Sequence, residues 1–585
     1  MTNRIRTVTR ALALALCLAT ASNAQTQPHR FDLRRNFFAS DAEEARDRQQ
    51  VRESFARLSA LAARCTNAPG ALAVALNRWS DTERRFRLHD LYFFARSALN
   101  TEENHGPEVR ELRESRRAAT RAVRAAICAT PKQRLEQFVR HDRRLKRFAH
   151  FLGSAKEECR HRPDPSLQSA IDEYEFASDP AFYFDAVSHT DFGTVASSNG
   201  ILDVLNHQGE LLADPAPAVR EETQRKLWEG YAKHQELFAH GLAEIVRACN
   251  AKAHLVNYAS CVEQAFAAEE LKEPLVRRWY DQIAASWPWA RTVPGASSND
   301  PTGLRFTFEE AADVIERAVA PLGPEYQSET KALLDPRNGR TDVEGGPHRL
   351  PLQGTASVDP IGTSIFYAFH FEGNYLDLML LAHEVGHAVQ AMMMSRAGVP
   401  PLNGRGSAWM TESFGRFNEL LVADFLYRTA QDPARNALLR DELLRRAFVL
   451  YGAASEGGVE LALHQQIARG GRASPQEFSD VTRTEGSRFS DRFQRTFDPL
   501  LWTRVDTYYV APLQATSSMV SSIVALVLYR RFRDSPDRFL DGYLRLLKNG
   551  YDASSVQLLR RFVAIDVQSD GLVPEAVQML QEVSR

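Results

Sequence analysis

The residues whose types and spacing could carry chemistry lie at His383-Glu384-Val385-Gly386-His387. Residues 376–394 contain no proline and a single glycine, which predicts one largely buried helix of about five turns. Residues four apart share one face of a helix, so His383 and His387 can present two imidazoles to a single ion, with zinc as the first expectation. Glu384 would stand beside the ion, where a carboxylate can deprotonate a metal-bound water.

A catalytic zinc usually takes three protein ligands and keeps a fourth position open, so a third ligand is expected downstream. Glu412 is the candidate. It lies in residues 407–427, where phenylalanine and leucine recur at intervals of three and four, the pattern of a second helix. Glycines and prolines between residues 398 and 406 predict a loop that turns the chain back. Two antiparallel helices joined in this way can bring Glu412 to the ion.

These residues carry a resemblance to a known family. The helix from Asp377 to His387, with Glu412 25 residues later and a second acid at Glu419, resembles the thimet oligopeptidase superfamily, and within it the oligoendopeptidase F-like branch. Segments 220–228, 334–342 and 543–550 support the resemblance, which covers nearly all of the chain after residue 24.

The resemblance implies a mainly α fold in which two helical lobes enclose a deep channel, with a small β-sheet beside a thermolysin-like HExxH helix at 376–394. It also implies a zinc metalloendopeptidase that hydrolyses internal bonds of short peptides, because the channel would exclude folded proteins. His383, His387 and Glu412 would hold one zinc ion, and Glu384 would be the general base. Zinc is inferred from the ligand types, and manganese or cobalt could substitute.

Residues 1–24 predict a secretory signal peptide. They combine a basic start, an apolar run from residue 11 to 19 and the small-residue exit Ser22-Asn23-Ala24. The apolar run is too short to span a bilayer, although a short N-terminal anchor is the alternative. We therefore expect a periplasmic or secreted protein with no membrane association beyond export. Residues 25–190 would form an N-terminal helical lobe and 191–585 the catalytic region, with the boundary in 163–189, which is rich in Pro, Asp and Ser.

Composition limits the partners. Charged residues make up 25% and hydrophobic residues 44% of the chain, which suits a globular enzyme. A formal net charge of −2 argues against nucleic acid as a partner, so short peptides are the expected ligands. Of six cysteines, Cys17 belongs to the signal peptide, and the other five allow up to two disulfides with one thiol left over. Cys249 and Cys261 are a possible pair.

Two segments lead into the zinc helix. Residues 323–362 are rich in glycine and proline and are expected to be loop-like. Residues 364–371 are β-branched and aromatic, which predicts a strand. Such a strand could hold an extended peptide by backbone hydrogen bonds, or it could simply belong to the core.

The expected oxyanion donors depart from the family pattern. Members of the family usually carry a histidine and several tyrosines near the C-terminus that face the scissile bond. The corresponding segment here, residues 502–518, contains no histidine, and Tyr508 and Tyr509 are its only tyrosines. We expect one of the two to supply the phenolic donor, since loss of an oxyanion donor costs about 100- to 1,000-fold in rate.

Three functions fit these observations. The first is an exported oligoendopeptidase. The second is a zinc-binding relative that is catalytically weak or inactive and binds peptides, and the third is a dipeptidyl carboxypeptidase, which would need an anchor for the substrate's carboxylate. The intact Glu384 favours the first, because a protein that only binds peptides has no use for a general base. Glu419, two turns after Glu412, is the candidate for orienting a zinc-bound imidazole, whereas Asp377 is expected to cap the helix.

Overall fold

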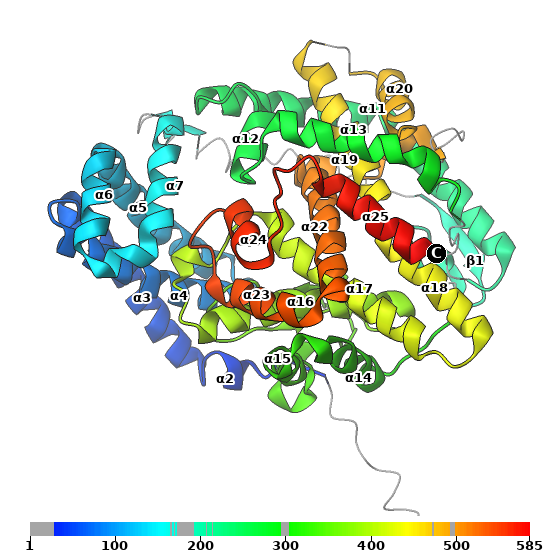
Figure 1. The fold of residues 1–585 in the computed structure, drawn as a ribbon, viewed down its shortest axis with the longest axis horizontal. Coiled ribbons are helices and arrows are strands. Elements are labelled where there is room, and N and C mark those ends of the chain that lie inside the picture. Colours follow the sequence, from blue (N-terminus) through cyan, green and yellow to red (C-terminus); the bar gives the residue numbers. More distant parts are fainter. Residues whose placement is uncertain are drawn as a thin grey trace, which may run out of the picture.

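The computed structural model describes residues 29–163, 192–205, 214–293, 303–470, 473–491 and 498–585, together with the short stretches 167–168, 170–171 and 207–212. The predicted signal peptide and nearly all of the predicted domain boundary lie outside these residues. Helices dominate the described chain, as predicted (Figure 1). Within it, no helix is both long and apolar enough to cross a membrane.

The N-terminal helices pack around their own buried cluster and lie together at one side of the molecule (Figure 1). They are α2 (Leu33–Asn36), α3 (Asp41–Cys65), α4 (Pro69–Leu99), α5 (Gly106–Ala129), α6 (Lys132–His141) and α7 (Ala149–Glu157). The Ser40 side chain caps α3 by accepting from the backbone of Glu43, and Pro69 opens α4, where a missing N–H costs nothing. A disulfide between Cys128 and Cys159 ties the end of α5 to the turn after α7.

A second group of elements runs along the top of the molecule and down its right-hand side in the view of Figure 1. Its elements are the hairpin β1 (Thr194–Ser197) and β2 (Gly200–Asp203), then α10 (Gln208–Leu212), α11 (Pro217–Leu255), α12 (Cys261–Ala268) and α13 (Glu273–Ala290). The predicted pair Cys249 and Cys261 forms a disulfide that joins α11 to α12. Cys65 is a buried free thiol, so the expected count of two disulfides and one leftover cysteine is confirmed.

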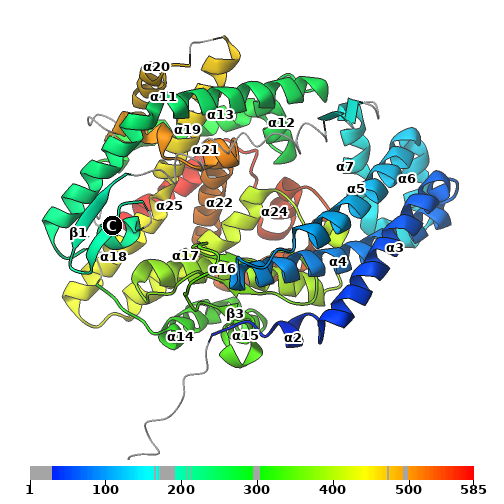
Figure 2. The ribbon, with the colours of Figure 1, turned by 180° about the vertical axis from the view of Figure 1, so that it is seen from behind.

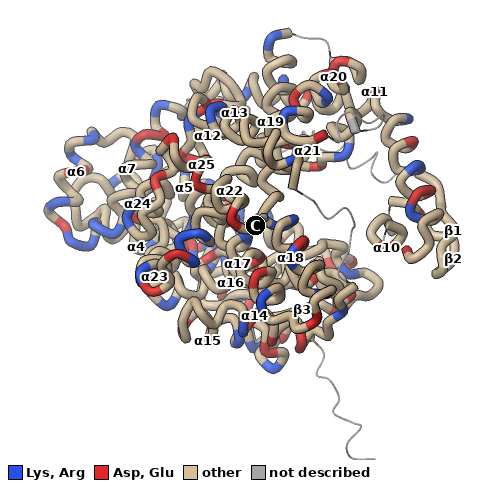
Figure 3. The backbone as a smooth tube through the Cα atoms, turned by 45° about the vertical axis from the view of Figure 1, so that its right-hand side comes forward, with Lys and Arg blue, Asp and Glu red and all other residues tan. Residues whose placement is uncertain are grey.

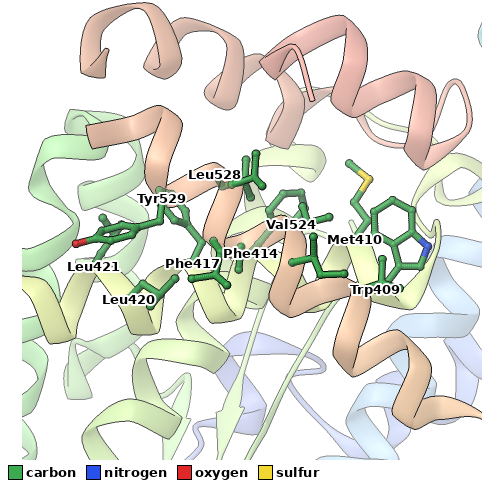
Figure 4. Packing of buried hydrophobic residues seen from close by; sticks show 14 of the residues in the cluster. Trp409, Met410, Phe414, Phe417, Leu420, Leu421, Val524, Leu528 and Tyr529 are labelled. Atoms are coloured by element: carbon green, nitrogen blue, oxygen red, sulfur yellow. The ribbon is translucent and has the colours of Figure 1, made fainter. Parts of the chain in front are cut away.

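The remaining helices include those that surround the HExxH segment and share the largest buried cluster with it, whereas α20 and α21 pack in a separate cluster with α11. They are α14 (Phe308–Val319), α15 (Pro324–Leu334), α16 (Tyr375–Arg396), α17 (Ala408–Thr429), α18 (Pro433–Ala447), α19 (Val449–Ala468), α20 (Pro475–Gly486), α21 (Thr507–Val510), α22 (Gln514–Asp534), α23 (Pro536–Asn549), α24 (Ser555–Val563) and α25 (Leu572–Ser584). Figure 4 shows Phe414 and Phe417 of α17 against Val524 and Leu528 of α22. Because α17 is buried between α16 and α22, it is held firmly beside the HExxH helix α16.

The small sheet beside α16 has the strand order β3-β5-β4. Its strands are β3 (Thr341–Asp342), β4 (Thr355–Ala356) and β5 (Phe366–Tyr367), with β3 parallel and β4 antiparallel to β5. The chain is therefore mainly α, with a small sheet beside the HExxH helix, as expected. Acidic and basic residues are interspersed over its parts (Figure 3).

Two local predictions were wrong in extent. The strand expected over 364–371 is only Phe366–Tyr367, and it is the central, buried strand, so the edges of this sheet belong to β3 and β4. The segment expected to be a loop, 323–362, contains the helix α15. Its proline stands at the first helical position, where proline is tolerated, and Tyr326 and Leu333 are buried against the core.

Candidate metal centre and general base

The HExxH helix α16 begins at a reciprocal cap. The Asn374 side chain accepts from the Asp377 backbone at 2.9 Å, and the Asp377 carboxylate accepts from the Asn374 backbone at 3.3 Å. The capping role predicted for Asp377 is confirmed. This cap sets where the helix starts, and the two histidines follow on the face that α17 covers.

The structure brings the three predicted metal ligands together. His383 Nε2 lies 3.1 Å from His387 Nε2 and 3.2 Å from Glu412 Oε2, and His387 Nε2 lies 3.5 Å from Glu412 Oε1. One ligand atom from each residue can be chosen so that all three lie within 4.8 Å of one another, and no other such group occurs in the described residues. The imidazole of His387 is 6% exposed and the carboxylate of Glu412 37%, so the cluster has one open side.

Glu419 orients the first imidazole. Its Oε1 lies 2.7 Å from His383 Nδ1, and its Oε2 accepts from Arg446 at 3.0 Å. The predicted contact of Glu419 with a histidine of the HExxH helix is confirmed. An Nδ1–H donated to Glu419 leaves the lone pair of a neutral His383 on Nε2, facing His387 and Glu412. Lone pairs that converge in this way need a proton or a cation among them, so the residues fit a metal ion.

Electrostatics agree with this arrangement. Burial opposes the charge on His383, but the Glu412 and Glu419 carboxylates outweigh it and raise its pKa to about 10. Burial together with the charge on His383 lowers the pKa of His387 to about 4. Burial likewise opposes ionisation of Glu412 and Glu419, but the hydrogen bond from His383 and nearby positive charges hold both pKa values well below the usual range. Glu412 is therefore ionised, as a metal ligand must be.

Glu384 stands beside the cluster in a different environment. Its carboxylate is 9% exposed, and burial raises its pKa to about 7. The Ala356 backbone N–H of the edge strand β4 lies near the carboxylate and offsets part of this rise in pKa. A carboxylate poised near neutral pH and next to a candidate metal position has the properties of a general base.

The comparisons with known proteins agree on one family. No protein-family model matches the chain. The chain is 21% identical over 500 residues to Oligopeptidase PepF of Bacillus subtilis, covering 80% of this chain and 72% of that protein. It is 18% identical over 463 residues to the plasmid Oligoendopeptidase F of Lactococcus lactis subsp. cremoris, covering 75% and 74%.

Solved structures share the whole architecture. A protein of Chlamydophila abortus aligns with a TM-score of 0.76 and 15% identity over 96% of this chain and 99% of that one. Oligoendopeptidase F of Enterococcus faecium aligns with a TM-score of 0.65 and 15% identity over 93% and 98%. The chain is thus similar in sequence and in fold to oligoendopeptidase F proteins, and the predicted resemblance to this branch of the thimet oligopeptidase superfamily is confirmed. These similarities support a peptidase.

The structure places the two tyrosines elsewhere in this oligoendopeptidase F-like fold. Tyr508 and Tyr509 are buried in the cluster formed with α11 and α19, apart from the one that contains α16. The Tyr508 hydroxyl donates to the Glu456 carbonyl at 2.6 Å, and the Tyr509 hydroxyl donates to the Trp502 carbonyl at 3.2 Å. Burial raises the pKa of both phenols well above the usual value. Their role as oxyanion donors stays a prediction, and this conformation does not supply it.

Sequence reasoning missed two glycines that shape the centre. A Cβ on Gly386 would lie 2.9 Å from the Phe414 carbonyl oxygen, so this glycine lets α16 and α17 approach closely. A Cβ on Gly415 would lie 2.7 Å from the His383 ring, in the space that the imidazole occupies. The Asn418 side chain on α17 donates to the Ala382 carbonyl on α16 at 3.1 Å. This hydrogen bond fixes the register of the two helices. The sequence signal that could have pointed to this close approach is a glycine inside each of the two predicted helices.

Replacing Gly415 by alanine is expected to displace His383 and weaken metal binding. Overpacking of this kind costs about 1–3 kcal/mol, which corresponds to roughly a 10- to 100-fold loss of zinc affinity. Gly452 on α19 is the matched control, because a Cβ there meets nothing within 4 Å and the helix gains propensity. Competition with a chromophoric chelator measures the zinc affinity of both variants. A wild-type affinity in Gly415→Ala would contradict the packing argument.

Metal affinity is expected to rise with pH. In the metal-free protein His383 keeps its proton up to about pH 10, and a bound ion must displace it. Affinity should therefore increase about tenfold per pH unit between pH 6 and 8.5, after correction for the competing chelator. In Glu419→Gln the His383 pKa falls, so the affinity should level off at lower pH and end roughly 10- to 100-fold weaker. A wild-type affinity independent of pH would rule out the proton on His383.

Proposed function

We propose that this protein is an exported, zinc-dependent oligoendopeptidase that hydrolyses internal bonds of short peptides. The observation that carries the proposal is the convergence of His383, His387 and Glu412, with the buried Glu384 beside them. The names of the relatives support an action on oligopeptides.

His383, His387 and Glu412 would hold one zinc ion, since two imidazole nitrogens and a carboxylate are a usual donor set for a catalytic site. When bound, zinc lowers the pKa of a coordinated water toward about 7 and polarises the scissile carbonyl. Glu419 keeps the His383 ring in the orientation that presents Nε2, and Arg446 in turn holds Glu419.

Glu384 moves the proton. Its carboxylate takes a proton from the attacking water and passes it to the departing amine nitrogen, so that one residue acts first as base and then as acid. Burial supports this role, because a carboxyl with a pKa of about 7 both accepts and releases a proton at neutral pH.

Export is supported by residues 1–24 and by the disulfides. The pairs Cys128–Cys159 and Cys249–Cys261 are typical of oxidising compartments such as the periplasm. Cell fractionation of the source organism, with N-terminal sequencing of the mature protein, tests this part. Cytosolic protein that still begins at residue 1 would contradict it.

The second candidate is a zinc-retaining relative that binds peptides and cuts them poorly. It is favoured by the hydroxyls of Tyr508 and Tyr509, which are engaged with backbone carbonyls. The test is digestion of a mixture of short peptides by protein that starts after residue 24, with and without a zinc chelator, read by mass spectrometry. Chelator-sensitive internal cuts support the endopeptidase. Release of C-terminal dipeptides alone would point to a dipeptidyl carboxypeptidase, and no cuts by zinc-loaded protein would favour the second candidate.

A further inference from the structure

The two disulfides lie on opposite sides of one contact. The bond between Cys128 and Cys159 braces the segment after α7, and Arg160 follows Cys159 directly. The bond between Cys249 and Cys261 braces the turn between α11 and α12, residues 256–260. The two braced segments meet, although the N-terminal helices and α12 belong to separate buried clusters. Figure 2 shows α7 at the end of the N-terminal helices that faces α12.

The contact consists of two hydrogen bonds and one ring stack. His161 Nδ1 donates to the Val256 carbonyl at 3.1 Å. The Asn257 side chain donates to the Arg160 carbonyl at 3.0 Å. The rings of His161 and Tyr258 are parallel, with centroids 3.6 Å apart. None of these five residues is fully buried, so the two segments can separate without opening a core.

Such a small contact depends on the shape of the segments that make it. Two hydrogen bonds and a stack favour the closed over the open arrangement by roughly 10- to 100-fold. The entropy lost in ordering two flexible segments would offset this preference. The disulfides lower that entropy cost because they constrain both segments beforehand. Cys159 directly precedes Arg160, and Cys261 lies within one turn of Tyr258, so both braces are next to the contact.

One short helix connects this contact to the candidate metal centre. The Glu269 carbonyl, just after α12, accepts from the Trp409 indole at 2.9 Å. Glu270 Oε2 accepts from Ser407 Oγ at 3.2 Å. Both partners stand at the start of α17, just before Glu412. Helix α12 is eight residues long, so its two ends touch the braced contact and the helix that carries the third candidate ligand.

We propose that this contact is a redox-sensitive latch. With both disulfides intact, the latch holds the N-terminal helices closed against the α11–α12 turn, at the edge of the candidate site. A dithiol breaks each S–S bond to give two cysteine thiols and is itself oxidised to a disulfide, and the freed segments then release the latch. Because disulfides persist in oxidising compartments, the latch closes only after export.

The test measures the distance between the two sides of the latch. Fluorophores are attached through unnatural amino acids at Gln133 on α6 and Ala268 on α12, which are both exposed, and energy transfer is followed in single molecules. The oxidised wild type is expected to show one closed population. A dithiol should lower the ratio of closed to open molecules by about 10- to 100-fold and add a population of lower transfer.

Two kinds of variant identify what holds the latch. His161→Ala removes the stack and one hydrogen bond and keeps both disulfides, so it should open the oxidised protein. His141→Ala is the matched control, because that exposed imidazole bonds the Gln137 carbonyl of its own helix at 2.7 Å. Replacing Cys128 and Cys159 together by serine should open the latch without a dithiol. Circular dichroism checks that the helices are kept in each sample.

Two results would overturn the latch. Energy transfer that stays the same after thiol analysis has shown both disulfides to be reduced would mean that they do not keep the contact closed. Transfer in oxidised His161→Ala equal to that of the wild type would mean that this contact does not hold the two sides together. The measurement needs neither zinc nor a peptide, so the latch can fail while the proposed peptidase function stands, and the reverse.

Discussion

Replacing Glu384 by glutamine is expected to remove peptide hydrolysis and to leave the metal in place. Glutamine keeps the shape of the side chain and cannot accept the proton of the attacking water. General acid–base catalysis contributes about 100- to 10,000-fold, so kcat should fall by at least about 100-fold. Glu384 is not one of the three converging ligands, so the metal content should not change. Steady-state kinetics and elemental analysis of the same sample check both parts.

The control for this experiment is Glu372→Gln. Glu372 is an exposed acid just before α16, so the same chemical change there should alter neither rate nor metal content. Activity of Glu384→Gln near the wild-type level would show that another group moves the proton. Loss of metal from Glu384→Gln would instead place its carboxylate among the ligands.

Replacing Glu412 by alanine is expected to release the zinc. The carboxylate contributes the third ligand atom, 3.2 Å from His383 Nε2 and 3.5 Å from His387 Nε2. Two histidines alone make an incomplete site. The zinc affinity should therefore fall by more than the roughly 10- to 100-fold that is lost when a residue hydrogen-bonded to a metal ligand is removed. Activity should be lost with the metal. Equilibrium dialysis against buffered zinc measures the loss, and circular dichroism checks that the helices are kept.

Asp424→Ala provides the matched control on the same helix. Asp424 pairs with Arg428, one turn further along α17, and lies beside Tyr529 of α22, but it is not one of the three converging ligands. It should bind zinc as the wild type does. A full equivalent of tightly held metal in Glu412→Ala would mean that a different residue is the third ligand.

The two helices of the centre could be predicted because their signals are local. Apolar periodicity without breakers predicts 376–394 and 407–427, close to the observed Tyr375–Arg396 and Ala408–Thr429. The spacing of His383 and His387 fixes their common face, and the intervening glycines and prolines indicate the turn. The partnership of Glu419 with His383 followed from the two-turn spacing between Glu419 and Glu412.

The remaining features depend on tertiary contacts that a single sequence does not encode locally. Gly415 matters only because the His383 ring lies against it, and neither residue's own neighbours indicate that contact. The pairing of Cys128 with Cys159 depends on how α5 meets the turn after α7. The expectation that Tyr508 or Tyr509 donates to the oxyanion rested on their position along the chain. In the fold, both hydroxyls donate instead to backbone carbonyls, in a buried cluster separate from that of α16. The strand predicted at 364–371 was too long, because aromatic residues are common in buried segments of any structure as well as in strands.

Metal reconstitution tests the central claim most directly. Chelator-treated protein is titrated with zinc while hydrolysis of a quenched peptide and bound metal are measured in the same samples. We predict no hydrolysis without metal and a linear rise that ends at one equivalent of zinc, with Glu384→Gln binding the same equivalent and staying inactive. Hydrolysis by the metal-free protein, or a wild type that binds one zinc and cuts none of the peptides, would contradict a zinc-dependent peptidase centred on His383, His387 and Glu412.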